Sequence, residues 1–105
     1  MTFAVLFAPQ ARADLFRLFQ YLIDRAKTAE DLDLAERAIA AIESAAQLHL
    51  SRTPFIYRKT AHGSGLRREL IVPFGASGYV LLYEIADPAT VLILAVRHQL
   101  EQDYH

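Results

Sequence analysis

Four histidines and a glycine-rich turn are the first residues in this sequence that invite a chemical interpretation. The histidines lack the i, i+4 spacing and the accompanying acid of a helical zinc site; they are His49, His62, His98 and His105. Gly63-Ser64-Gly65 lacks the preceding strand, the further glycines and the lysine of a phosphate-binding loop. The chain has no cysteine to serve as a nucleophile or a metal ligand. We therefore expect no metal site and no cofactor.

Hydrolytic chemistry also lacks its usual groups. No serine stands in a nucleophile elbow, and no two carboxylates fall at neighbouring strand ends in the way that acid-base hydrolysis requires. The sequence therefore assigns no catalytic residue.

One long segment of the chain is basic throughout. From Ser44 to Arg68 there is no acidic residue, and its cations are Arg52, Arg58, Lys59, Arg67 and Arg68. Guanidinium groups on or beside a strand bind phosphates or carboxylates through two parallel hydrogen bonds. The run equally fits a solvated loop. Both interpretations stay open, and the first makes candidate partner-binding residues of Arg58, Lys59, Arg67 and Arg68.

A second polar cluster follows the last predicted strand. After Val96 the chain carries Arg97, His98, Gln99, Glu101 and Tyr104. Side chains at a strand end are held in place by a rigid element, which suits binding. The alternative is a tail that simply packs back on the sheet through Tyr104. We take all five as candidate partner-binding residues.

Apolar periodicity predicts the elements that must position these groups. The balance of 53% apolar and 22% charged residues predicts one folded domain over residues 1–105. Residues 3–7 indicate a short strand buried on both sides. Apolar residues at three- and four-residue steps then predict two helices, one opening at Pro9 and one capped by Thr28 and Asp31. The short turn between them predicts an antiparallel hairpin.

The second half of the chain predicts a sheet. Residues 51–65 show no sustained period and predict a long loop. Strands follow at 66–73, 79–86 and 90–96, separated by turn residues, and predict an antiparallel meander. The last two are apolar on both faces and should be central, where Tyr79 and Tyr83 pack in the core rather than stack on bases. The fold class is therefore α+β: an N-terminal strand, a helical hairpin and a three-stranded antiparallel meander, giving a four-stranded sheet.

Net charge and hydropathy limit where the protein acts. The formal net charge is -1, so the whole molecule does not attract nucleic acid. We expect no direct sequence-specific DNA binding by this chain alone. No apolar run approaches the roughly 20 residues of a membrane span, and the N-terminus lacks a signal-peptide pattern. We therefore expect a cytoplasmic protein without a membrane partner.

Four stretches in this order resemble the RelE/ParE toxin superfamily. They are Pro9-Gln10-Ala11-Arg12-Ala13-Asp14-Leu15, Leu66-Arg67-Arg68-Glu69-Leu70-Ile71-Val72-Pro73, Gly78-Tyr79-Val80-Leu81-Leu82-Tyr83-Glu84-Ile85 and Ile93-Leu94-Ala95-Val96-Arg97-His98-Gln99. The resemblance covers nearly the whole chain. It implies the toxin of a type II toxin-antitoxin pair, neutralised by a ParD-like antitoxin whose C-terminal segment wraps the toxin.

The superfamily divides by target. RelE-like members are similar to ribosome-dependent RNases that carry an arginine after the aromatic residue of the third strand, and Val80 stands there in this chain. ParE-like members resemble inhibitors of DNA gyrase, and the residues 69–73 and 96–99 are closer to theirs. Leu100 departs from the arginine that many ParE relatives carry after His-Gln, which puts full toxicity in doubt.

The resemblance therefore favours a gyrase inhibitor that is not an enzyme. The alternatives are a ribosome-dependent mRNA endoribonuclease, with His98 or Tyr104 transferring a proton, and an antitoxin-binding module without toxicity.

Overall fold

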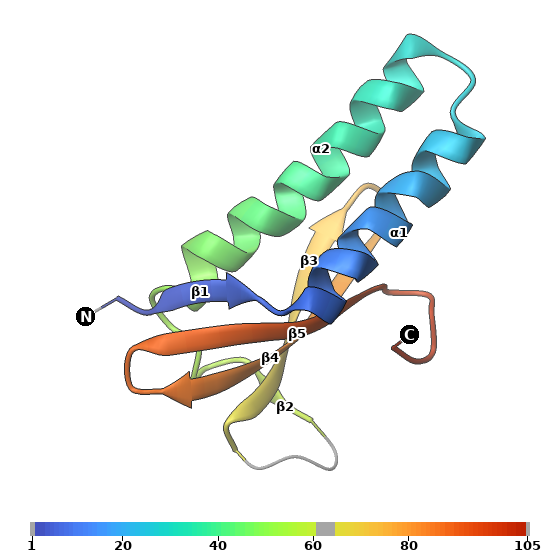
Figure 1. Cartoon of the computed structure of the whole chain (residues 1–105). Helices are drawn as coiled ribbons and strands as arrows, with labels where there is room; N and C mark the ends of the chain where they lie inside the picture. The colour runs from blue at the N-terminus through green and yellow to red at the C-terminus, as the bar shows by residue number, and fades with distance from the viewer. Residues whose placement is uncertain (1, 61–64, 105) are drawn as a thin grey trace.

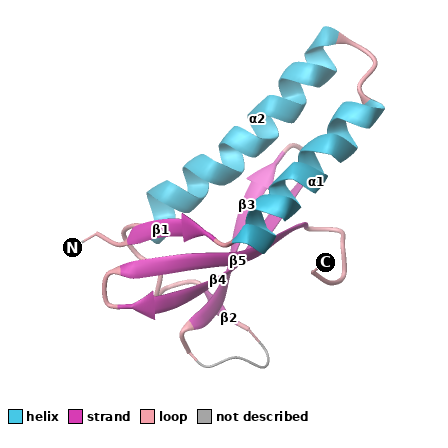
Figure 2. Cartoon of the chain, in the orientation of Figure 1, coloured by secondary structure: helices cyan, strands magenta, loops and turns pink. Residues whose placement is uncertain are grey.

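The computed structural model describes residues 2–60 and 65–104 and folds them as two layers, a helical hairpin lying on a mixed sheet (Figures 1 and 2). His62, Gly63, Ser64 and His105 lie outside the described residues. The elements in chain order are β1 (Ala4–Phe7), α1 (Pro9–Arg25), α2 (Ala29–Ala45), a π-helical turn η1 (Ala46–Leu50), β2 (Arg58–Lys59), β3 (Arg67–Phe74), β4 (Ser77–Asp87) and β5 (Thr90–His98). The predicted strand, hairpin and three-stranded meander are confirmed.

The two helices form where the sequence places their signals. Pro9 occupies the first turn of α1, where its missing N–H costs no hydrogen bond. The Thr28 hydroxyl accepts the Asp31 backbone N–H at 3.1 Å and so caps α2. Ala35 and Ala38 of α2 are fully buried, and these small side chains let the helices approach closely. No helix within residues 2–60 and 65–104 is long and apolar enough to cross a membrane.

Within the part of the chain that the structure describes, the sheet has five strands in the order β1-β5-β4-β3-β2. β3, β4 and β5 pair antiparallel as the predicted meander, while β1 pairs parallel with β5. The central places of β4 and β5 confirm the prediction from their apolar character. Helices cover one face of the sheet, and we call the opposite face the outer face (Figure 1).

Two sequence-based predictions about the strands were wrong. β1 is not buried on both sides: it is an edge strand whose Leu6 is 54% exposed, because the helices cover one face only. Residues 51–65 are not all loop, since Arg58 and Lys59 pair with Glu69 and Arg68 as β2 and add a fifth strand to the expected four. A two-residue strand is too short to leave a period in the sequence.

A bulge in β5 decides which side chains face the helices. Leu82 of β4 pairs with Ala95 and Tyr83 pairs with Ile93, so Leu94 is an extra residue. The alternation therefore shifts by one, and both Ile93 and Val96 are fully buried in the core. Beyond the bulge His98 lies on the helix side and Arg97 on the outer face.

A buried carboxylate joins α1 to the sheet. β1 ends opposite Ile93, so among residues 2–60 and 65–104 no strand lies on that side of the following part of β5. Asp14, 1% exposed, accepts the Val96 backbone N–H there at 2.9 Å and the Gln10 amide at 3.0 Å. Asp14 supplies the hydrogen bond that a continuing β1 would have made, and so satisfies a buried donor.

We expect Asp14→Ala to lower the free energy of unfolding by about 2 kcal/mol, because the buried Val96 N–H loses its acceptor. Asp14→Asn should cost less, since its amide oxygen still accepts. Urea denaturation measures both changes. Asp24→Ala, an exposed change on the same helix, should stay within about 0.5 kcal/mol of the parent. Equal midpoints for Asp14→Ala and Asp24→Ala would contradict the anchoring role.

Candidate partner-binding site

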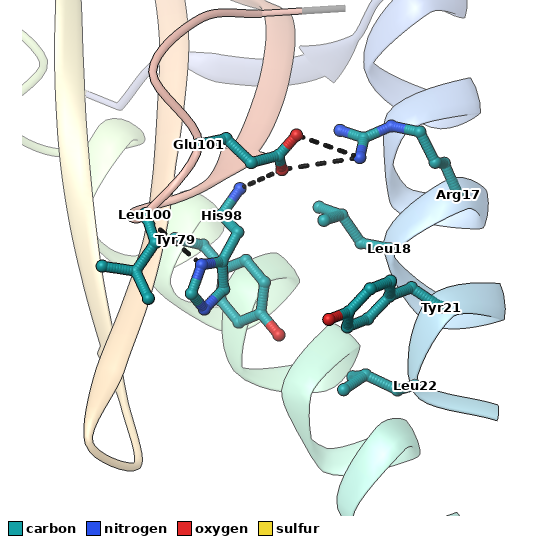
Figure 3. A pocket seen from close by; sticks show the side chains of 8 residues that line it. All are labelled: Arg17, Leu18, Tyr21, Leu22, Tyr79, His98, Leu100 and Glu101. Carbon is teal, nitrogen blue, oxygen red and sulfur yellow. Dashed lines mark hydrogen bonds and ion pairs between the residues drawn. The ribbon is translucent and has the colours of Figure 1, made fainter. Parts of the chain in front are cut away.

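The space between the middle of α1 and the end of β5 forms a pocket of about 390 Å³ (Figure 3). Its lining side chains are Arg17, Leu18, Tyr21 and Leu22 of α1, Tyr79 of β4, and His98, Leu100 and Glu101 at the end of β5 and in the tail. Figure 3 shows both tyrosines presenting their hydroxyl groups to this space. Burial raises the pKa of Tyr79, so its hydroxyl stays neutral at physiological pH. The pocket therefore combines apolar walls with a few hydrogen-bond donors, as binding pockets do.

His98 is held at both ring nitrogens. Its Nδ1 accepts the Leu100 backbone N–H at 3.1 Å, and its Nε2 lies 3.0 Å from the Ser77 hydroxyl. A neutral imidazole that accepts at Nδ1 carries its proton on Nε2 and donates it to Ser77. A base that activates a serine needs the opposite arrangement. The Ser77–His98 pair is therefore a structural contact and not a nucleophile with its base.

Glu101 ties the tail to both β5 and α1. Its carboxylate accepts the His98 backbone N–H at 2.8 Å, and Arg17 Nη1 lies 3.3 Å from Oε2 (Figure 3). Two other nitrogens of Arg17, Nε and Nη2, are buried without a hydrogen-bond partner in the described chain. Desolvation of those nitrogens offsets the ion-pair attraction. The contact thus fixes where the tail lies more than it stabilises the fold.

A chain of polar contacts crosses the outer face. Arg97 pairs there with Val80, and its guanidinium carbon lies 5.2 Å from the centre of the Tyr104 ring. The Tyr104 hydroxyl donates to one Glu69 oxygen at 2.5 Å, and Arg58 Nε lies 2.9 Å from the other. Burial and then this hydrogen bond raise the pKa of Tyr104. The tail packs back on the sheet through Tyr104, as one of the two sequence interpretations has it.

The side chains of the remaining predicted residues make other contacts. Arg67 lies 3.5 Å from Glu84 of β4. Arg68 donates to the carbonyls of Gly65 and Tyr57 at 2.9 and 2.7 Å. Lys59 lies on the edge strand β2 and Gln99 lies in the tail, and both side chains are exposed.

The predicted residues therefore divide into three groups. His98 and Glu101 line the pocket, and Arg58, Arg97 and Tyr104 meet on the outer face. The side chains of the third group, Lys59, Arg67, Arg68 and Gln99, belong to neither, and only the backbone carbonyl of Gln99 accepts from Arg97, at 3.4 Å.

Comparison with known proteins places this arrangement in a family. A family model described as the ParE toxin of the type II toxin-antitoxin system parDE matches residues 5–103. The chain belongs to the ParE toxin family. It is also similar to two Caulobacter vibrioides proteins: Toxin RelE3, 40% identical over 90% of this chain and 91% of that protein, and Toxin RelE1, 32% identical over 97% and 99%.

A solved structure shares the fold of this ParE-family toxin. It is described as a chromosomal ParDE TA system from P. aeruginosa, and it aligns with a TM-score of 0.67 at 13% identity over 91% of this chain and 95% of that chain. The sequence-based resemblance to the RelE/ParE superfamily is confirmed.

The geometry separates the two groups of the toxin that are best suited to move a proton. His98 faces the pocket under α1, while Tyr104 lies across the outer face. Consecutive strand residues point to opposite faces, so the side chains of His98 and Arg97 are presented to different surfaces. Glu69 also brings a carboxylate between Arg58 and Tyr104. A phosphate approaching these groups would meet a negative charge.

Several residues of the site escaped sequence reasoning. Arg17 and Tyr21 lie four residues apart on α1, a spacing that puts them on one face, but nothing in the sequence says that the end of β5 faces them. Ser77 meets His98 only through the β4–β5 register. Glu69 is the first acid after the basic segment in the sequence. Its position could have indicated that part of the positive charge of that segment is neutralised within the chain, as the ion pair with Arg58 shows.

We expect the toxin to lose stability above about pH 10, the ordinary pKa of tyrosine. Burial raises the pKa of Tyr83 and Tyr104 in the folded chain. The folded state therefore holds these protons more tightly than the unfolded state, and the resulting stability is complete below pH about 10 and is lost as the pH rises toward the folded pKa.

Urea midpoints measured between pH about 8 and about 11 test this expectation. Tyr83→Phe and Tyr104→Phe should each make the decline shallower, because the missing phenol no longer titrates. Measurements of both variants near pH 7 give the cost of the lost hydrogen bonds alone. A decline as steep in both variants as in the parent would refute the assignment.

Proposed function

We propose that this chain is a growth-arresting toxin that binds DNA gyrase without covalent chemistry and is neutralised by a ParD-like antitoxin. The observation that carries the proposal is the separation of His98 and Tyr104 on opposite faces of the sheet. A nuclease without a metal must activate a ribose hydroxyl, steady the phosphate and protonate the leaving oxygen at one place. The residues of this chain support binding better than that reaction.

The state of each candidate group supports the same proposal. His98 has its Nε2 proton directed at Ser77, and the Tyr104 hydroxyl donates to Glu69. A raised pKa makes Tyr104 a poor base at neutral pH. Val80, at the position where RelE-like members carry an arginine, is 1% exposed and adds no charge to the outer face.

A second candidate function is RNA cleavage on the ribosome. Both similar Caulobacter toxins carry the RelE name. Arg58, Arg97 and Tyr104 also gather on one face, so a rearrangement that withdraws Glu69 would leave two guanidinium groups beside a phenol. The following experiments distinguish gyrase inhibition from RNA cleavage and from a loss of toxicity.

The antitoxin is the other proposed partner. The ParDE description of the structural neighbour supports it at the level of the system. A partner with acidic residues would meet the cations of the Arg52–Arg68 stretch, of which Arg58 and Arg67 already face the acids Glu69 and Glu84. Recognition would then combine local charge with an apolar groove or a sheet edge.

We expect the purified chain to inhibit supercoiling by purified gyrase and to trap cleaved DNA. The inhibition should disappear on addition of the antitoxin. Supercoiling assays with relaxed plasmid measure both effects. Unchanged supercoiling together with no trapped breaks would count decisively against gyrase as the target.

Tyr104→Phe should keep growth arrest within about threefold of the parent, because the ring that packs on the sheet remains and no proton transfer is required of it. A proton-transfer group in a nuclease contributes about a hundredfold or more. Titrated expression in growing cells measures the arrest, and transcript mapping in the same cells detects cleavage. Loss of both arrest and cleavage in Tyr104→Phe would establish the RNase alternative.

Salt should slow antitoxin association more than it speeds dissociation. Charges on the basic stretch act mainly by steering the encounter, and a Debye length of about 8 Å at physiological salt screens that steering. Rapid-mixing measurements over a range of salt concentrations give both rates. An association rate that does not change with salt would remove the electrostatic part of the proposal.

A further inference from the structure

A second hollow, of about 380 Å³, lies between the two helices of the hairpin, which run side by side (Figure 1). Its lining side chains come from both helices; they are Leu15, Phe16 and Phe19 of α1 and Glu36, Ile39, Ala40 and Glu43 of α2. These residues differ from those that line the pocket between α1 and the end of β5. We call this hollow the hairpin groove.

The hairpin groove leaves apolar surface open to solvent. Phe16 is 69% exposed, and the neighbouring Phe19 and Ile39 are half-buried. Covering an exposed aromatic ring removes apolar area from water, and the surrounding apolar side chains add contacts with whatever covers it. The groove is therefore suited to apolar side chains of a partner.

Carboxylates lie on the α2 side of the hairpin groove. Glu36 and Glu43 are both exposed, and neither forms an ion pair within residues 2–60 and 65–104. Helix α2 carries five acids and one base, Arg37, which lines the adjacent hollow together with Asp33 and Glu36. The local field is therefore negative, so it attracts cations and repels the phosphates of a nucleic acid or an anionic lipid.

The spacing of the two carboxylates indicates the backbone of the partner. Glu36 and Glu43 are seven residues apart on one helix, so they lie on one side of it and roughly 10 Å apart along its axis. A partner helix lying along the groove repeats that spacing with cations seven residues apart and apolar residues between them. Side chains on one face of an extended strand recur at roughly 7 and 13 Å, which fits less well.

We propose that the hairpin groove binds an amphipathic helix of a partner protein, with apolar side chains against Phe16 and lysines or arginines against Glu36 and Glu43. This surface is distinct from the Arg52–Arg68 stretch, whose cations would attract acids instead. The inference goes beyond the proposed function, because it does not depend on gyrase being the target.

Two designed peptides of about three heptads test the inference with the whole chain. The cationic probe has leucines at heptad positions a and d and lysines at e and g, and the acidic probe has glutamates at e and g. Like charges at these positions discourage each probe from pairing with itself. Fluorescence anisotropy of the labelled probes gives Kd. The cationic probe should bind at least about tenfold more tightly than the acidic probe.

Variants of the chain locate the binding. Glu36→Gln with Glu43→Gln should raise the Kd of the cationic probe about fivefold, the size expected for loss of two exposed ion pairs, and should weaken its salt dependence. Asp24→Asn with Glu30→Gln is the matched control, since it changes the net charge equally at exposed positions that do not line the groove. Its Kd should stay within about twofold of the parent. Phe16→Ser should raise Kd at least about tenfold.

Thermal unfolding of each variant shows whether it stays folded. If Phe16→Ser unfolds, Phe16→Leu should give a smaller loss of affinity in the same direction. Equal affinity of the parent for the two probes overturns the inference, and so does an equal loss in the groove and control variants. A cationic probe that binds without gaining helical circular dichroism overturns it as well.

Sedimentation of the parent chain tests the other occupant, a second copy. Dimerisation that Phe16→Ser abolishes would assign the hairpin groove to that copy and overturn the inference, whereas a monomeric parent supports it. None of these measurements uses gyrase or growth arrest. A failure here is therefore separate from a failure of the proposed function.

Discussion

The hydrogen bond from the Val96 backbone to the buried Asp14 carboxylate sets the relation between the helices and the sheet. It lies where β1 has ended and β5 continues, so α1 takes over from a strand as the neighbour of β5. Val96 is two residues before His98, and Arg17 is one turn after Asp14. The pocket walls formed by Arg17 and His98 are therefore positioned by a bond between their near neighbours. A shift of α1 along β5 would break the Val96–Asp14 hydrogen bond and would also change the shape of the pocket.

The bulge at Leu94 adds the second constraint. A regular strand would place Ile93, Ala95 and Arg97 on one face and would bring the guanidinium under the helices. Because one extra residue is inserted, Val96 enters the core and Arg97 emerges on the outer face beside Tyr104. The polar residues at the end of β5 are thus divided between two surfaces of the sheet.

The elements with strong local signals were predictable from the sequence. Pro9, Thr28 and the apolar repeats define the helices, and the Val-, Ile- and Leu-rich runs define β3, β4 and β5 to within one or two residues. The candidate site was predicted less well, because the register between β4 and β5 decides which of its side chains lie next to each other. Arg97 and His98 were singled out from the sequence as candidates, yet their opposite directions follow from a bulge that has no sequence signature. Asp14 does leave a signal, an acid among the buried helix positions Ala11, Leu15 and Leu18. A charged residue on an apolar stripe needs a buried partner, and only the structure identifies it as a backbone N–H.

Pairing of charges within the chain determines what kind of recognition remains available. Arg17, Arg58 and Arg67 each face a carboxylate, and Arg68 is engaged by two carbonyls. Such pairs produce weak fields beyond a Debye length, so long-range steering of a partner falls chiefly to the exposed cations Arg52 and Lys59. A partner carboxylate that displaces one of the paired acids leaves that acid to be solvated or paired elsewhere. This limits the net gain in binding free energy. Strong binding must then come chiefly from apolar surface that is exposed and already ordered. The described chain offers exposed apolar surface in the pocket beneath α1 and at the anchored residues Phe55 and Ile56.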